Sequence, residues 1–139
     1  MTEKKLICVI CPNGCELRAV IDEGPQTVIK EITGELCEKG PVWAEQELLN
    51  PMRTIASSIV VDGGDYPLVS VRTDSAIPLK SISDVMKAIK SIKIKAPVRI
   101  GAVLIKEPAG TSCNIIATRH VNETYSESDK NPEHQSKKL

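Results

Sequence analysis

The sequence predicts an α+β protein: an N-terminal metal-binding β-hairpin, followed by a small strand-rich unit with one main amphipathic helix. The core must be aliphatic, because the chain has 16 Ile and 12 Val but no Phe, and aromatic residues make up 2% of it. Such a β-branched bias favours strands over helices. Four of the five cysteines lie before residue 38. One later segment has apolar residues repeated at helical spacing.

Composition narrows the class of protein. At 139 residues the chain is one domain or two small ones. Charged residues make up 26%, the formal net charge is zero, and no basic stripe with interleaved aromatic residues points to nucleic acid. No segment approaches the ~20 apolar residues of a membrane span. The apolar run Leu6–Cys11 is too short for a secretion signal and lacks a cleavage site. We therefore expect a cytoplasmic protein whose cysteines are metal ligands or free thiols.

The first expected domain covers residues 1–53. The alternation of apolar residues at Leu17, Ala19 and Ile21 predicts a strand, and the turn residues 22–25 end it. A second strand is expected over 27–32, and it returns the chain towards Cys37. A helix over 42–49 follows, with Pro41 in its first turn and Asn50-Pro51 ending it.

The second expected domain covers residues 54–121. Strands over 57–61 and 67–73 flank Asp62-Gly63-Gly64-Asp65, a strong hairpin signal. A helix runs from Ser81 or Ser83 to about Ile92, with apolar residues along one face. Strands over 97–105 and 113–119 complete the domain. Residues 122–139 are polar and aperiodic, and we expect them to be disordered.

The cysteines carry the chemistry. Cys8, Cys11, Cys15 and Cys37 have the spacing C-x2-C-x3-C-x21-C. A structural zinc site usually takes two paired knuckles, whereas three ligands plus one suit a cuboidal [4Fe–4S] cluster. The first His is at position 120, so a mixed Cys/His zinc site in this segment is excluded. An iron–sulfur cluster is the favoured interpretation, and an all-cysteine zinc site is the alternative.

Three motifs resemble a known domain: Cys11-Pro-Asn-Gly-Cys15, then Gly34-Glu-Leu-Cys37-Glu-Lys39-Gly40, then Asn50-Pro51-Met-Arg53. On these motifs, residues 6–53 resemble the N-terminal [4Fe–4S] domain of molybdopterin oxidoreductases. The resemblance implies that the four cysteines are cluster ligands and that Lys39 lies beside the cluster. Those enzymes continue for several hundred residues that bind the pterin, so the cluster domain is implied here and the molybdenum chemistry is not.

The chain as a whole resembles a family of small bacterial and archaeal four-cysteine proteins of unassigned function. The later part of that resemblance lies in Pro97-Val-Arg-Ile-Gly101 and Ile116-Ala-Thr-Arg119. Members look like companions of FAD-dependent dehydrogenases of the anaerobic glycerol-3-phosphate type. The resemblance therefore implies a flavoprotein partner.

The chain shows no catalytic triad, phosphate-cradling glycine loop or catalytic carboxylate pair, so we do not expect an enzyme on its own. We expect an iron–sulfur electron-transfer protein or subunit serving a flavin-dependent oxidoreductase. The alternative is a zinc-stabilised protein-interaction module without a redox role. Lys39 is expected either to offset the charge of the cluster or to be an ordinary solvated lysine. Cys113 and Trp43 are expected to be packing residues.

Overall fold

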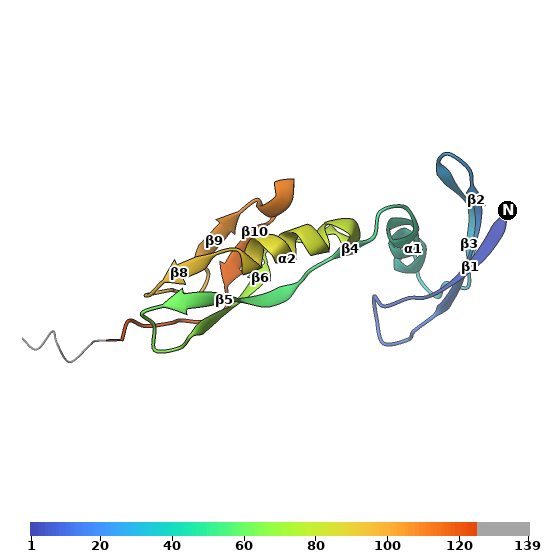
Figure 1. Ribbon diagram of the computed structural model, residues 1–139. Helices are drawn as coiled ribbons and strands as arrows, with labels where there is room; N and C mark the ends of the chain where they lie inside the picture. Colours follow the sequence, from blue (N-terminus) through green and yellow to red (C-terminus); the bar gives the residue numbers. More distant parts are fainter. Residues whose placement is uncertain (125–139) are drawn as a thin grey trace, which may run out of the picture. The chain divides into compact units, whose positions relative to one another are not determined.

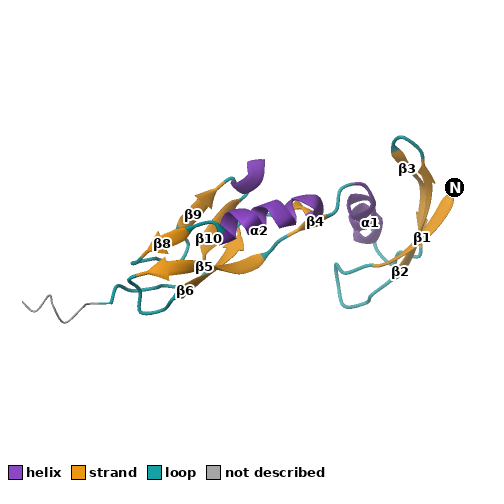
Figure 2. Ribbon diagram, in the orientation of Figure 1, coloured by secondary structure: helices purple, strands orange, loops and turns teal. Residues whose placement is uncertain are grey.

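The computed structural model describes residues 1–124. These residues form a small mixed α/β protein with two α-helices and strand-rich sheets (Figure 2). The chain divides into two compact units (Figure 1). Unit 1 comprises Met1–Arg53 with Ile77–Lys80, and the described part of unit 2 comprises Thr54–Ala76 and residues 81–124.

Unit 1 is built on an antiparallel sheet with the strand order β1-β2-β3. Its strands are β1 (Thr2–Ile7), β2 (Glu16–Glu23) and β3 (Thr27–Thr33). The predicted alternation of buried and exposed side chains along β2 is confirmed. Leu17, Ala19 and Ile21 are fully buried, and the residues between them are more exposed. Helix α1 (Lys39–Leu49) contacts β2 and β3. The short strand β4 (Met52–Arg53) pairs with β7 (Ile77–Pro78), which brings a later segment into this unit.

Unit 2 is built on a five-stranded sheet with the order β8-β5-β6-β10-β9. Its strands are β5 (Ala56–Asp62), β6 (Leu68–Thr73), β8 (Lys93–Lys95), β9 (Val103–Lys106) and β10 (Asn114–Ala117). Only the pairing of β5 with β8 is parallel among these. The predicted hairpin is confirmed: β5 and β6 are antiparallel, and Gly63 has a φ of +68° in the turn between them.

The predicted amphipathic helix is α2 (Ile82–Lys90), which follows a 3₁₀ turn over Leu79–Ser81. It runs along the five-stranded sheet and contacts β5, with Val85 and Ile89 buried (Figure 1). The core beneath it is aliphatic, as the composition predicted. Its fully buried members on the sheet are Ile59, Val69, Val71, Ile115 and Ala117. A second short 3₁₀ turn, Pro108–Gly110, lies between β9 and β10 and also contacts α2.

Several elements differ from the sequence prediction, which did not include the short strands β4, β7 and β8. Strand β1 was not anticipated, because its side chains are mostly exposed and show no alternation. Helix α1 begins at Lys39, three residues earlier than predicted. The predicted strand over 97–105 is wrong in its first half: residues 97–102 are irregular, with a turn at Gly101 (φ +82°), and β9 begins at Val103.

The ordered part of unit 2 also extends further than expected. Val121 pairs with Val98, and Glu123 forms an isolated bridge with Gly64. The Asn122 amide donates a hydrogen bond to Asp65 Oδ1 at 2.9 Å. Residues 122–124, which the sequence placed in a disordered tail, are therefore hydrogen-bonded to the rest of the unit. The remainder of that tail, residues 125–139, lies outside the described residues. Neither helix within residues 1–124 is long and apolar enough to cross a membrane.

Candidate metal centre

The first three cysteines lie on one turn at the end of a β-ladder. Strands β1 and β2 pair up to Ile7 opposite Glu16, and the Cys8 amide then donates to the Cys15 carbonyl at 2.9 Å. This bond closes the eight-residue loop, with Cys11 at its exposed part. Gly14, with a φ of +59°, supplies the left-handed conformation that the turn requires. The spacing C-x2-C-x3-C thus corresponds to a loop held at both ends.

The fourth cysteine reaches this loop because the chain passes very close to β2. Strand β3 ends at Thr33, paired with Arg18. The next residue, Gly34, has a φ of +96°, and a Cβ atom there would lie 2.2 Å from the Glu16 carbonyl oxygen. Only glycine permits so close an approach of two backbones. Gly34 therefore brings the segment that carries Cys37 alongside the residue that follows Cys15.

The four cysteines line one cavity of about 260 Å³. The other lining residues are Ile10, Asn13, Leu17, Glu35, Leu36, Lys39 and Gly40. Cys8 is buried, Cys15 is half-buried, and Cys11 and Cys37 are exposed. All four are free thiols. The cavity is thus buried on the Cys8 side and open to solvent on the side of Cys11 and Cys37.

Helix α1 closes one wall of this cavity with its N-terminal end. The Gly40 amide donates to the Cys37 carbonyl at 3.3 Å, so Cys37 lies directly before the first turn. Gly40 is buried, and a Cβ atom there would lie 3.6 Å from the methyl groups of Leu17. The positive end of a helix dipole favours negative charge placed beside it. This end of α1 is therefore suited to a ligand group that carries the negative charge of thiolates.

A small apolar core lies next to the cavity and includes residues that line it. Cys8, Leu17 and Ala44 form a buried cluster, and Cys15, Ile32 and Trp43 pack against it. Trp43 therefore packs against the buried cluster that contains Cys8, in agreement with its expected role as a packing residue. Two of the four thiols belong to this core, so their positions depend on how α1 packs on the sheet.

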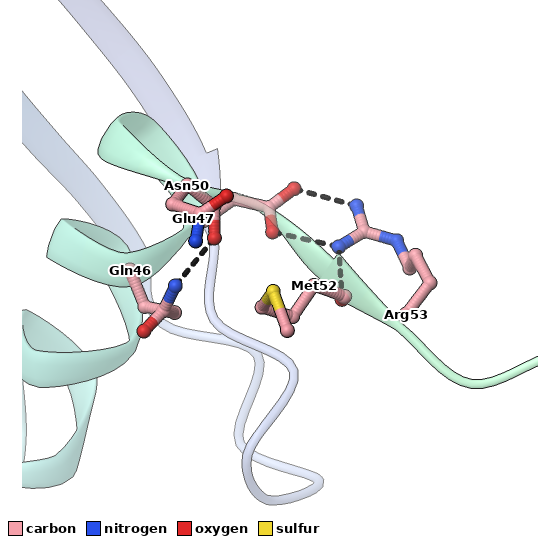
Figure 3. A network of polar contacts seen from close by, with 5 residues as sticks. All are labelled: Gln46, Glu47, Asn50, Met52 and Arg53. Carbon is pink, nitrogen blue, oxygen red and sulfur yellow. Dashed lines mark hydrogen bonds and ion pairs between the residues drawn. The ribbon is translucent and has the colours of Figure 1, made fainter. Parts of the chain in front are cut away.

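The electrostatics of the same unit include one well-formed ion pair at the other end of α1. Arg53 donates to Glu47 from Nη1 at 2.8 Å and from Nη2 at 2.6 Å, and Nη1 also donates to the Met52 carbonyl at 2.8 Å (Figure 3). The hydrogen bond from Arg53 holds the pKa of Glu47 below its usual range, and the same bond raises the pKa of Arg53. Gln46 donates to the Asn50 carbonyl beside it. These contacts fix the exit of α1 into β4.

The geometry bears on the kind of metal group that would fit. Within residues 1–124, no three Cys, His, Asp or Glu side chains come together closely enough to hold a single metal ion. A tetrahedral zinc site needs four sulfurs at about 2.3 Å from one point. The four thiols border the cavity of about 260 Å³. Their donor set is all thiol, which is the ligand type of iron–sulfur clusters and also of all-cysteine zinc sites.

Lys39 is the first residue of α1 and lines the cavity together with the cysteines. Cys113 lies in unit 2, fully buried, with its Sγ 3.3 Å from Thr111 Oγ1. It does not line the cysteine cavity, which agrees with its interpretation as a packing residue. In unit 2, the Nδ1 atom of His120 accepts a hydrogen bond from the Ile100 amide at 3.1 Å.

Sequence reasoning missed three residues of this site. The motif that contains Gly34 does not by itself predict the close approach to Glu16, although a glycine three positions before Cys37 is a signal for such a contact. Ile10 and Leu36 line the cavity from the loops on either side of the cysteines. Nothing in their local sequence distinguishes them from ordinary apolar loop residues.

Comparison with known proteins gives a family but no activity. No curated protein matches the chain. Residues 38–119, more than half of the chain, match a family described as "Protein of unknown function (DUF1667)". The chain belongs to the DUF1667 family. The part of this DUF1667 protein that matches begins at Glu38, directly after Cys37, and includes Lys39.

One solved structure is similar to this DUF1667 protein, the NMR structure of Clostridium perfringens protein CPE0013. It has 18% sequence identity and a TM-score of 0.46. The similarity covers 63% of the present chain and 98% of the Clostridium protein.

Proposed function

We propose that this protein is a small iron–sulfur electron-transfer protein or subunit that serves a flavin-dependent oxidoreductase. Its cofactor is a [4Fe–4S] cluster with Cys8, Cys11, Cys15 and Cys37 as ligands. The observation that carries the proposal is that these four thiols, from two separate loops, line one cavity. The resemblance of residues 6–53 to the cluster domain of molybdopterin oxidoreductases supports the same assignment.

The residues of the cavity have distinct roles in this proposal. The four thiolates hold the cluster, and the buried apolar side chain of Leu17 limits the access of water. The N-terminal end of α1 and the ammonium group of Lys39 offset negative charge in the cavity. When bound, such a cluster stores one electron at a time, which suits exchange with a flavin that takes two electrons from its substrate.

A partner enzyme follows from the same chemistry. A cluster that stores one electron performs no reaction on most metabolites. A protein whose cofactor is such a cluster therefore needs another protein as its electron donor. A flavoprotein dehydrogenase meets that need, because a flavin can release electrons singly. The openness of the cavity at Cys11 and Cys37 supports this role, since electrons pass most readily where the cluster comes closest to the surface.

Anaerobic reconstitution with iron and sulfide tests the assignment. We expect about four iron and four acid-labile sulfides per chain, with visible absorption that is lost on reduction. Each of Cys8→Ser, Cys11→Ser, Cys15→Ser and Cys37→Ser should impair the centre. Cys113→Ser is the matched control, because that thiol lies in unit 2 and does not line the cavity. Stoichiometric zinc without uptake of iron would show instead a zinc-stabilised interaction module.

A further inference from the structure

A second hollow adjoins the cysteine cavity. This groove has a volume of about 580 Å³ and is lined by Ile10, Glu38, Lys39, Val42, Trp43 and Gln46. It shares Ile10 and Lys39 with the cysteine cavity, so the two hollows are neighbours. Five of the six lining residues belong to α1 or are the residue before it, and those on α1 occupy the positions of one helical face. Whatever occupies the groove would lie next to the bound cluster.

The groove exposes apolar side chains that nothing within its own unit covers. Val42 is 69% exposed and Ile10 is 47% exposed, and Leu36 at the edge of the cysteine cavity is 77% exposed. Single exposed apolar residues are ordinary, but Ile10 and Val42 line the same groove, and a group of exposed apolar side chains is typical of an interaction site. Trp43 adds an aromatic surface at the groove, and tryptophan is enriched among the residues that contribute most to binding.

Charge narrows the chemistry of the occupant. Over Met1–Arg53, nine acidic residues outnumber six basic ones, and four thiolates would add further negative charge. Glu35 lines the cysteine cavity and Glu38 lines the groove, and among residues 1–124 Lys39 is the only basic residue that lines either hollow. A partner that presents an apolar side chain between basic residues would match both the apolar lining and the acidic surroundings.

We propose that this groove is the docking surface for a partner protein that inserts an apolar protrusion flanked by Lys or Arg. The biological role of this docking surface rests on the proposed function, since docking here would place the partner's redox group beside the cluster. Its binding step, however, involves only residues of this chain. It can therefore be measured whether or not electrons are transferred.

The test uses Trp43, the only tryptophan of the chain, as a fluorescent reporter. The probe is a synthetic amphipathic helix of leucine and lysine, compared with the same peptide carrying glutamate in place of lysine. We expect the lysine peptide to change the Trp43 emission of the full chain and the glutamate peptide to leave it unchanged. Val42→Lys should weaken binding at least about ten-fold, the effect of losing one strong contact.

Val28→Lys is the matched control. Val28 is 47% exposed, lies on β3 outside the groove, and gives the same change of net charge. Equal affinity of the two variants, or equal binding of the glutamate peptide, would overturn the docking surface. Dimerisation that Val42→Lys alone abolishes would show that a second copy occupies the groove. If the peptide distinguishes the variants but no flavoprotein reduces the wild-type cluster, the proposed function fails and the docking surface stands.

Discussion

Arg53 and Glu47 join strand β4 to helix α1 through two hydrogen bonds, from Nη1 to Oε2 at 2.8 Å and from Nη2 to Oε1 at 2.6 Å (Figure 3). Bidentate pairs of this kind hold their geometry better than single contacts do. Arg53 also donates to the carbonyl of its neighbour Met52. The pair therefore fixes the direction in which the chain leaves α1, at the end opposite the cysteine cavity.

The first prediction concerns Arg53→Ala. We expect a lower urea midpoint for unit 1 with an unchanged dependence on denaturant, because the pair is lost and the fold is kept. The pair is partly exposed, so the effect should be modest. Arg18→Ala is the control, since Arg18 pairs with exposed Glu16, which is only two residues away in the sequence. Equal shifts for the two variants would show that the bidentate pair has no special role.

The second prediction concerns pH. Because Arg53 lowers the pKa of Glu47 from 4.5, the pair stabilises the fold fully above that pH, and the contribution is lost as the pH falls through the lower folded pKa. The difference in the free energy of unfolding between wild type and Glu47→Gln should therefore be constant near pH 7 and shrink below about pH 4.5. Urea titrations at several pH values measure it. A difference that grows on acidification would contradict the assignment.

The third prediction concerns Gly34→Ala. The new methyl group would lie 2.2 Å from the Glu16 carbonyl oxygen, at a φ of +96°. The backbones must separate, and we expect a loss of at least about 2 kcal/mol in unfolding free energy together with impaired cluster assembly. Gly24→Ala in the β2–β3 turn is the control, because its nearest atom would be 3.8 Å away. Normal iron content in Gly34→Ala would show that Cys37 reaches its place by another route.

The fourth prediction concerns Lys39→Ala. If the ammonium group offsets the charge of the cluster, its removal should lower the reduction potential and slow reduction by a flavoprotein dehydrogenase, with iron content unchanged. Lys30→Ala on β3 is a suitable control, because Lys30 is exposed and lines neither hollow. Potentiometric titration of both variants checks this. Identical potentials would make Lys39 an ordinary surface lysine.

The fifth prediction concerns removal of the metal. The core around the cysteines is small, with Cys8, Leu17 and Ala44 at its centre, whereas unit 2 has its own aliphatic core around α2. Chelation should therefore reduce amide-exchange protection within unit 1 and leave unit 2 protected. Uniform loss along the chain would mean that both units unfold together.

Patterns with a local cause were predictable from the sequence. The alternation over Leu17–Ile21 and the two glycines at 63 and 64 identify β2 and the β5–β6 hairpin, because burial and turn geometry act on neighbouring residues. Strand β8 could not be recognised, since Lys93-Ile94-Lys95 becomes a strand only by pairing in parallel with distant β5. Strand β1 likewise depends on its register with β2.

The candidate site also has one part that the sequence predicts and one part that it does not. Spacing alone grouped Cys8, Cys11, Cys15 and Cys37, which do line one cavity. The groove beside it was not predictable, because Ile10 and Val42 are far apart in sequence and meet only once α1 packs on the sheet. The close approach at Gly34 is a tertiary contact as well, although the glycine itself was visible.

The pairing of β4 with β7 has a consequence for how the protein is made. The chain leaves unit 1 after Arg53, builds β5 and β6, returns for Ile77–Lys80 and leaves again. Ile77 is buried, and the Leu79 amide donates to the Pro51 carbonyl at 2.8 Å. During synthesis the ribosome must therefore release about 80 residues before the first unit can close. A fragment that ends at Arg53 would hold all four cysteines and still lack part of the unit that carries them.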